Sequence, residues 1–481
     1  MFIGLERLGD IVQAESVRSD QIPKPSAAIK LRTNILRGYG VGKGVPVALS
    51  QLASPDFFAD LLAIWSCGAQ AICLDVSLTP AERANVLAFS SAKFVLLASG
   101  DESGSWPVQK LVLSEMKNDE RAKAMQHPAT PMLDDPALVL FTSGTTGDPK
   151  GVVHSFRSLQ ARMALNAMAI GLGPGDTALL TLPVHFGHGL IGNALSPLFA
   201  GARLIVAPKG MTLASKLASV IDDYGVTFLS SVPAFWRMAM KLGPKPKSSS
   251  LRRVHVGSAP LSLDLMKRIE DWAGCEVYNC YGITETGNWI GGASSRDPLM
   301  RDGFVGRPWG GAAAVLSADG KMHSIGEGEI VVETPSLMTG YLARPDLTAA
   351  AFIDGWFRTG DWGTVDHIGN ICLSGRLKDE INRAGFKVQP AEIDMLLESH
   401  DDVEEACTFG IPDVLGTEIV AAAVKLKEKS TQTPDSLRAW CLERLRRDAT
   451  PERWFIVQEI PKTSRGKLRR DVVRKTVLGE Q

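Results

Sequence analysis

A loop rich in glycine and hydroxyl residues carries the clearest chemistry in this sequence. Residues 140–152 read LFTSGTTGDPKGV, and the apolar run 137–141 stops where the loop begins. Glycine lets the backbone approach an anion closely, hydroxyl groups donate hydrogen bonds, and lysine supplies positive charge. The loop therefore predicts a site for the phosphates of a nucleotide, formed by Thr142, Ser143, Gly144, Thr145, Thr146, Gly147 and Lys150.

The spacing of this loop differs from that of a Walker A motif. Gly144-x-x-Gly147-x-x-Lys150 does not match GxxxxGK[ST], so a P-loop kinase is not indicated. The structural alternative is an ordinary connection between a strand and a helix. The density of small and hydroxyl residues, closed by a lysine, favours the nucleotide.

Composition and charge exclude several classes of protein. Of 481 residues, 45% are apolar, enough for a sizeable core and about three domain-sized units. Lys and Arg number 52 against 53 Asp and Glu, so no basic excess indicates a nucleic-acid partner. Seven scattered cysteines without CxxC spacing favour core residues in a reducing cytoplasm. The longest apolar segment, 57–76, contains Asp60 and Asp75, so no membrane span is expected.

The elements that would position the loop alternate along the first 230 residues. Short aliphatic runs such as VPVALS, AICLDV and ARLIVA alternate with stretches of helical period such as 55–67 and 156–170. This alternation predicts an α/β domain of parallel sheets covered by helices. From about residue 326 the pattern becomes β-rich, and after residues 375–379 an α+β pattern predicts a small second domain.

Five further segments follow the loop in order along the chain. They are NCYGITETG (279–287), GEGEIVVETPSLMTGYL (326–342), GWFRTGDWG (355–363), GRLKDEINRAGFKVQPAEID (375–394) and PKTSRGKLRR (461–470). Together with the loop they closely resemble the adenylate-forming superfamily of acyl-CoA synthetases, peptide-synthetase adenylation domains and beetle luciferases. The resemblance implies a large N-terminal domain (1–377) of parallel-rich sheets packed with helices, plus a β-barrel-like part. It also implies a small mobile α+β C-terminal domain (378–481) with a hinge at Lys378.

The resemblance implies a two-step reaction. A carboxylate attacks the α-phosphorus of ATP to give an acyl-adenylate and pyrophosphate, and the acyl group then passes to the thiol of CoA. A carboxylate is already a nucleophile, so positioning and charge neutralisation take the place of a general base. By similarity, Glu285 binds Mg²⁺, Thr284 contacts the α-phosphate, and Lys467 is the mobile lysine that bridges acid and phosphate. The remaining implied nucleotide contacts are Tyr281 stacked on the adenine, Asn279 near its exocyclic amine, Gly282, and Asp361 and Arg376 at the ribose.

The pocket for the acid is less clearly defined. LPVHFGHGL (182–190) matches the family segment with an aromatic gate, for which Phe186 is the candidate, flanked by His185 and His188. VGSAPLS (256–262) resembles the strand and loop that line the adenine and acyl pockets, through Gly257, Ser258 and Ala259. The loop containing Gly385 would border the channel for the thiol. An Asp that pairs with an α-ammonium is absent from 182–190, which counts against an α-amino acid as substrate.

Several alternatives remain at this level. Free CoA and the phosphopantetheine arm of an acyl carrier protein end in the same thiol, so a stand-alone ligase that loads a carrier protein is the alternative to a CoA ligase. A luciferase-like oxygenase would share the first step. A non-catalytic homologue would show damage to the functional motifs, which are intact. The sequence thus predicts a cytoplasmic ligase that uses a small carboxylic acid, ATP, Mg²⁺ and CoA.

Overall fold

Two sheets of mainly parallel strands form most of the N-terminal part of the protein. The computed structural model describes residues 8–14, 25–101, 104–116, 118–123, 131–142, 150–207, 210–248, 250–383, 386–413, 418–463 and 467–480. The first sheet has the strand order β18-β7-β6-β3-β2-β4-β5. Its strands are β2 (Pro46–Ser50), β3 (Gln70–Cys73), β4 (Phe94–Leu97), β5 (Gln109–Leu111), β6 (Pro136–Thr142), β7 (Lys150–Ser155) and β18 (Gly340–Tyr341). The pairs β6–β7 and β7–β18 are antiparallel, whereas the other pairs are parallel.

The second sheet has the order β1-β9-β8-β10-β11-β12-β13. Its strands are β1 (Ile11–Gln13), β8 (Thr177–Leu180), β9 (Arg203–Val206), β10 (Phe228–Ser231), β11 (Arg253–Gly257), β12 (Glu276–Ile283) and β13 (Asn288–Ser294). The strands from β1 to β12 pair in parallel, and β13 pairs antiparallel with β12. Parallel strands require crossovers, which are supplied by the helices between them.

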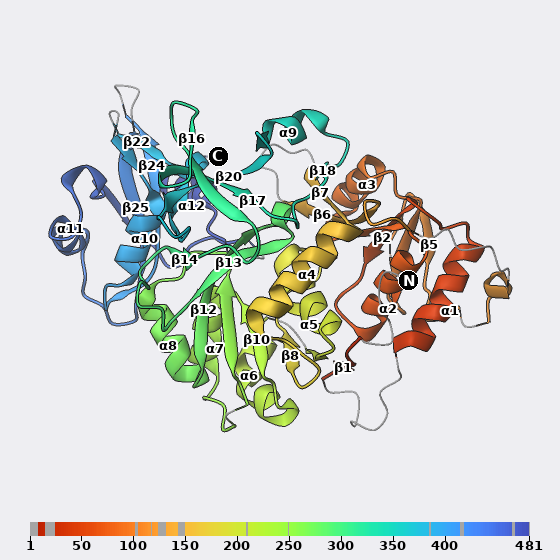
Figure 1. Cartoon of the computed structure of the whole chain (residues 1–481). Coiled ribbons are helices and arrows are strands. Elements are labelled where there is room, and N and C mark those ends of the chain that lie inside the picture. The colour runs from red at the N-terminus through yellow and green to blue at the C-terminus, as the bar shows by residue number, and fades with distance from the viewer. Residues whose placement is uncertain are drawn as a thin grey trace.

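Helices cover both faces of these sheets (Figure 1). One face of the second sheet packs on α6 (Met211–Tyr224), α7 (Pro233–Leu242) and α8 (Leu263–Ala273) in a continuous apolar cluster. Its other face packs on α4 (Phe156–Ile170), the π-helix η3 (His188–Leu195) and α5 (Ser196–Phe199), in a cluster shared with the first sheet. That cluster also takes in α1 (Pro25–Gly38) and α2 (Pro55–Ser66), while α3 (Pro80–Phe89) packs on the far face of the first sheet.

The sequence sets the ends of α4 clearly. Ser155 precedes the helix in extended conformation, and its side chain accepts a hydrogen bond from the amide of Ser158 at 3.2 Å. This is a standard N-cap, which satisfies one of the donors left free at a helix start. Gly171 ends the helix in the left-handed conformation with φ +69°, which favours glycine. The helix therefore begins directly after β7, the strand whose first residue, Lys150, ends the predicted phosphate loop.

An antiparallel sheet occupies the position of the predicted barrel-like part. Its order is β14-β21-β20-β17-β15-β16, with β19 paired to β20. The strands are β14 (Phe304–Gly306), β15 (Ala312–Leu316), β16 (Met322–His323), β17 (Gly326–Glu333), β19 (Phe352–Ile353), β20 (Trp356–Val365) and β21 (Ile371–Arg376), and the short helix α9 (Pro345–Ala350) precedes β19. The register pairs Asp361 with Arg376, so two predicted ribose-binding residues are neighbours across the sheet.

The C-terminal part has its own core. A turn, η5 (Leu377–Asp379), leads to β22 (Ile381–Arg383), β23 (Phe386–Val388), α10 (Pro390–Glu398), β24 (Val403–Pro412), β25 (Glu418–Leu426), α11 (Pro434–Leu442), η6 (Arg447–Ala449), β26 (Arg453–Ile456) and α12 (Arg470–Leu478). Among the described residues, the apolar clusters here contain only residues from 381 onwards, whereas the other clusters end at Leu373. This separation supports a boundary at Lys378, which stays a prediction.

The predicted fold class is confirmed: parallel-rich sheets packed with helices form a large domain, joined to a smaller α+β domain. Figure 1 shows the C-terminal part, in blue, beside α8, β14 and β20. Within the described ranges, no helix has both the length and the apolar character needed to cross a bilayer.

Candidate active site

A cavity of about 680 Å³ lies at the carboxyl ends of β6, β11 and β12, where the C-terminal part meets the sheets. Ligands of open α/β folds bind at this edge because the loops after the strands converge there. Many of the predicted site residues line this one cavity: Thr142, Lys150, Phe186, His188, Ser258, Gly282, Thr284, Glu285, Arg376, Lys378 and Lys467. The structure therefore brings together residues from every predicted motif.

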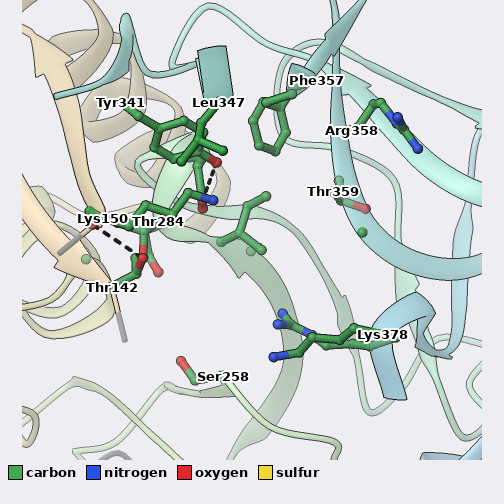
Figure 2. Close-up of a pocket in the computed structure, with 18 of the residues that line it drawn as sticks. Thr142, Lys150, Ser258, Thr284, Tyr341, Leu347, Phe357, Arg358, Thr359 and Lys378 are labelled. Carbon is green, nitrogen blue, oxygen red and sulfur yellow. Dashed lines mark hydrogen bonds and ion pairs between the residues drawn. The ribbon is translucent and has the colours of Figure 1, made fainter. Parts of the chain in front are cut away.

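The predicted phosphate-binding loop is described only at its two ends. Thr142 ends β6, Lys150 begins β7, and the two are paired in register. Five predicted members, Ser143, Gly144, Thr145, Thr146 and Gly147, lie outside the described residues. The Lys150 ammonium lies 3.9 Å from the centre of the Tyr341 ring and 3.8 Å from Glu285 Oε1 (Figure 2). Lys150 is thus held at the wall of the cavity by a ring face and a carboxylate.

Glu285 is oriented by a residue that the sequence analysis did not single out. It lies on the short turn η4 (Thr284–Thr286), and its Oε1 accepts a hydrogen bond of 2.8 Å from the Tyr341 hydroxyl. The described residues contain no cluster of three or more metal-binding side chains. Mg²⁺ commonly takes one or two carboxylates and completes its shell with phosphate oxygens and water. A single carboxylate at the wall of a cavity large enough for a nucleotide fits that pattern.

His154 fixes the backbone of this turn. It is fully buried, and its Nε2 lies 2.8 Å from the carbonyl oxygen of Thr284. Burial lowers the pKa of His154 to about 4, so the ring is neutral at physiological pH and Nε2–H donates to that carbonyl.

The glycine two residues before this turn, Gly282, is required by close packing, because a Cβ there would lie 2.0 Å from the Asn288 carbonyl oxygen.

The buried His154 predicts a loss of stability in acid. Its pKa is near 6.5 in the unfolded chain and about 4 when folded, so between these values only the unfolded state binds the proton. The contribution of this residue to the free energy of unfolding is fully present above pH 6.5, and it falls by about 3 kcal/mol as the pH drops toward 4. Urea unfolding at pH 7 and pH 4.5 should therefore show a smaller pH-dependent loss in His154→Gln than in the natural protein. Equal losses in both proteins would contradict this assignment.

Two buried polar residues, Tyr281 and Asp361, lie beside the partly exposed Arg376 at the predicted ribose site. The Tyr281 hydroxyl donates to Asp361 Oδ2 at 2.7 Å, and Arg376 Nε lies 2.9 Å from Asp361 Oδ1. Burial, followed by the charge of Asp361, raises the pKa of Tyr281 well above its usual value. The Asp361 carboxylate in turn raises the pKa of Arg376. Arg376 lines the cavity, whereas Tyr281 and Asp361 are almost completely buried beside it.

Asn279 is also buried, in β12. Its Nδ2 donates to the carbonyl oxygen of Phe304 at 3.0 Å, which fixes the amide against β14. It does not appear on the wall of the cavity among the described residues. Its predicted role at the exocyclic amine of adenine therefore stays a prediction.

Asp361→Asn should raise KM for ATP by about tenfold to a hundredfold, since hydrogen bonds to charged groups contribute about 1.5–3 kcal/mol. The substitution keeps the shape of the side chain but removes the charge that pairs with Arg376. Initial rates of pyrophosphate release at varied ATP would measure the effect. Asp319→Asn, in an exposed turn, is the matched control. An unchanged KM for ATP would exclude Asp361 from the nucleotide site.

Three of the candidates for the acid pocket, Phe186, His188 and Ser258, line the cavity. His188 Nδ1 lies 2.8 Å from Ser258 Oγ, and Nε2 lies 2.7 Å from Ser230 Oγ. Burial, with a smaller contribution from the charge of Lys467, lowers the pKa of His188 to about 3. His188 is therefore a neutral hydrogen-bonding residue at the wall of the cavity.

The other candidates for the acid pocket lie elsewhere. His185 turns to Asp75, with 3.2 Å between Nε2 and Oδ2, and is not on the described wall of the cavity. Gly257 is packed against β12, because a Cβ there would lie 2.7 Å from the Cys280 carbonyl oxygen. Ala259 is also not among the described wall residues, and Gly385 lies outside the described residues.

Lys467 reaches the cavity from the C-terminal part of the chain. Its carbonyl oxygen accepts a hydrogen bond of 2.8 Å from the Thr463 amide. Just beyond it, Arg470 at the start of α12 pairs with Asp394 of α10 at 2.6 Å. The position of Lys467 is therefore tied to the whole C-terminal core. Lys378, at the predicted hinge, lines the same cavity (Figure 2).

Comparison with known proteins places the chain in a family. The family described as AMP-binding enzyme matches residues 32–342, and its C-terminal domain matches residues 392–467. The chain belongs to the AMP-binding enzyme family. This confirms the predicted resemblance and the predicted class of enzyme, a ligase of this type.

Relatives of similar length agree with this assignment. The chain is 34% identical to the sulfoacetate–CoA ligase of Cupriavidus necator over 90% of this chain and 87% of that protein. It is 30% identical to the oxalate–CoA ligase of Arabidopsis thaliana over 93% of this chain and 91% of that protein. Among solved structures, ATP-bound MatB from Rhodopseudomonas palustris matches with a TM-score of 0.84 and 25% identity, covering 98% of this chain and 95% of that one. MenE from Bacillus subtilis, in complex with ATP and a magnesium ion, matches with a TM-score of 0.83 and 26% identity over 97% and 96%.

Proposed function

We propose that this protein is an ATP-dependent ligase that converts a small carboxylic acid into its CoA thioester through an acyl-adenylate. The observation that carries the proposal is that Lys467, from the C-terminal part, lines the same cavity as Lys150, Glu285 and Arg376. Cations from both parts of the chain thus surround a space of the size needed for a nucleotide and a small acid.

In the first step a carboxylate oxygen of the acid attacks the α-phosphorus of ATP, and the bond to the bridging oxygen of pyrophosphate breaks. The acid needs no general base, so the protein supplies orientation and charge neutralisation. Lys467 neutralises charge between the acid and the α-phosphate, Lys150 faces the leaving phosphates, and Arg376 with Asp361 orients the ribose. Glu285 would hold Mg²⁺, which supplies charge neutralisation on the phosphate oxygens.

In the second step the thiol sulfur of CoA attacks the acyl carbonyl and AMP leaves, with the thiol proton passing to solvent. The C-terminal domain (378–481) would turn about Lys378, withdraw Lys467 and present the loop containing Gly385 beside a thiol channel. Two working arrangements of one enzyme are a recognised device for separating sequential steps. The structure has the arrangement in which Lys467 lies in the cavity, which suits the first step.

CoA is favoured over a carrier protein as acceptor because both relatives described above are CoA ligases. A carrier protein remains the second candidate for the thiol. The cytoplasm is the proposed location. The seven cysteines are unpaired, as expected in a reducing compartment, and the proposed substrate ATP is available there.

The experiment is a pyrophosphate-release assay with purified protein, ATP and Mg²⁺. The panel holds short, long-chain, aryl, dicarboxylic and amino acids, each with and without CoA. Turnover with one class of acid that rises on addition of CoA would support the proposal. Adenylate that accumulates and does not react with CoA would indicate a carrier protein. No pyrophosphate with any acid would contradict the function.

A further inference from the structure

We propose that Glu329 is a positioning residue of the nucleotide site, because it holds residues 359–361 of β20 in the shape that places Asp361 at the ribose. The inference rests on the proposed function, since it concerns how that same site is kept in shape. Glu329 belongs to the segment 326–342, which contains none of the predicted site residues. The inference is carried by a break in a β-ladder, by the hydrogen bonds that close it, and by a buried ion pair.

The ladder between β17 and β20 is interrupted beside the predicted ribose site. Its register jumps between Glu329 and Val331, so the three residues 359–361 of β20 lie opposite the single residue Ile330. Extra residues on one strand make that strand bulge away from its partner. Residues 359–361 therefore leave the ladder as a bulge.

This bulge borders the cavity. Thr359 and Gly360 line it, and Figure 2 shows Thr359 across the cavity from Lys150. Asp361, at the end of the bulge, pairs across to β21 with Arg376, which also lines the cavity. A shift of the bulge would therefore move the cavity wall and the Asp361–Arg376 pair together.

Side chains supply hydrogen bonds to the bulge where the ladder is broken. The Gly360 amide donates to Glu329 Oε1 at 3.1 Å, and the Asp361 amide donates to Thr359 Oγ1 at 3.1 Å. The Thr359 hydroxyl donates to the carbonyl oxygen of Ile330 at 2.7 Å. Gly360 has φ +71°, a left-handed conformation that favours glycine. Glu329 thus takes the place of a backbone carbonyl at the centre of the bulge.

The Glu329 carboxylate is itself fixed by an ion pair. Only 4% of the residue is exposed, and its Oε2 accepts hydrogen bonds from Arg358 Nε at 3.0 Å and Nη2 at 2.7 Å. The guanidinium offsets the cost of burying the charge and leaves Oε1 to the Gly360 amide. A hydrogen bond to an ionised acceptor is about twice as strong as one between neutral groups. Arg358 therefore holds Glu329, and Glu329 holds the bulge.

The test measures how well the protein recognises the ribose. Titration calorimetry with Mg²⁺ compares the Kd of ATP with that of 2′,3′-dideoxy-ATP, which keeps the base and the phosphates but has no ribose hydroxyls. We expect ATP to bind the natural protein about a hundredfold more tightly, since two hydrogen bonds to a charged group are lost with the analogue. Asp361→Asn should lower this ratio by about tenfold.

Glu329→Gln is the first test of the positioning role. Glutamine keeps the shape of the side chain, but its single carbonyl oxygen cannot serve both the Gly360 amide and Arg358. The ratio of the two Kd values should fall by about tenfold, as in Asp361→Asn. Glu333→Gln, an exposed glutamate at the end of β17, is the matched control and should leave the ratio unchanged.

Gly360→Ala disturbs the bulge without touching Glu329. A Cβ on Gly360 would meet no atom within 4 Å, but alanine disfavours φ +71°, so the bulge must shift. The ratio should fall here as well. Gly355→Ala is the matched control, because Gly355 precedes β20 with φ +85° and also faces open space. It should leave the ratio unchanged.

The outcomes separate the inference from the proposed function. A purely structural role for Glu329 would lower the temperature of unfolding and leave the ratio as it was, so an unchanged ratio in either folded variant would overturn the inference. Equal binding of the two nucleotides by the natural protein would overturn the inference and the ribose contact of Asp361, while pyrophosphate release could still support the ligase. Binding of neither nucleotide would overturn both the inference and the proposed function.

Discussion

Replacing Lys467 with alanine should slow adenylate formation by about 10²–10³-fold, the usual effect of removing one group that stabilises transition-state charge. Thioester formation from a preformed acyl-adenylate and CoA should be nearly unchanged. The reason is that Lys467 lines the cavity in the present arrangement, beside His188, and would leave it for the second step. Pyrophosphate release measures the first step, and AMP release from the synthetic adenylate measures the second.

Lys475→Ala is the control for this prediction. Lys475 is an exposed lysine on α12, in the same part of the chain as Lys467. Its replacement changes the charge of the C-terminal part equally but should leave both steps intact. Loss of both steps in Lys467→Ala would argue against two working arrangements, and loss of neither would remove Lys467 from the mechanism.

Glu285→Gln should lower kcat by about 10²-fold or more and raise the Mg²⁺ concentration needed for half-maximal rate, since metal stabilisation of phosphate charge amounts to several kcal/mol. Glutamine keeps the shape of the side chain and can still accept the hydrogen bond from Tyr341. It loses the negative charge, which lies 3.8 Å from the Lys150 ammonium. The effect therefore reports on charge at the metal and phosphate site, and rates measured across a Mg²⁺ titration would reveal it.

Tyr341→Phe separates orientation from charge at this site. It removes the 2.8 Å hydrogen bond to Glu285 but keeps the ring over Lys150. The acceptor is a carboxylate, and a hydrogen bond to a charged group contributes about 1.5 kcal/mol or more, so a loss of about tenfold is expected. A loss in Tyr341→Phe as large as the one expected for Glu285→Gln would contradict the assigned roles. An unchanged Mg²⁺ requirement in Glu285→Gln would contradict them as well. Thermal unfolding of both variants checks that the fold is intact.

Residues within local motifs were largely predictable from the sequence. Thr142, Lys150, Glu285, Arg376 and Lys467 are named by short segments, and all of them line one cavity. The alternation of strand-like and helical stretches likewise predicted the parallel-rich sheets, because period and turn residues are local properties. The roles of these residues stay predictions until the variants are measured.

Contacts between distant segments could not be predicted. His154 lies 130 positions from Thr284, and a single sequence contains no signal that the ring of one meets the carbonyl of the other. Of two neighbouring histidines, His188 faces the cavity whereas His185 turns to Asp75, a choice set by tertiary packing around η3.

The Arg237–Glu398 ion pair has a consequence for the speed of the cycle. It joins α7 of the large domain to α10 of the small one, and both side chains are largely shielded from water. Because Arg470 ties α12 to α10, the proposed rotation of the small domain would carry Lys467 and α10 together and would separate Arg237 from Glu398 in every turnover. Dissolved salt screens the attraction between Arg237 and Glu398 when they are apart and exposed to water more than when they are paired and shielded. Salt therefore slows the return of the small domain to this arrangement more than it speeds its release. Raised ionic strength should therefore slow adenylate formation, the half-reaction that needs Lys467 in the cavity. The rate of the cycle would then depend on an ion pair that lies away from the substrates.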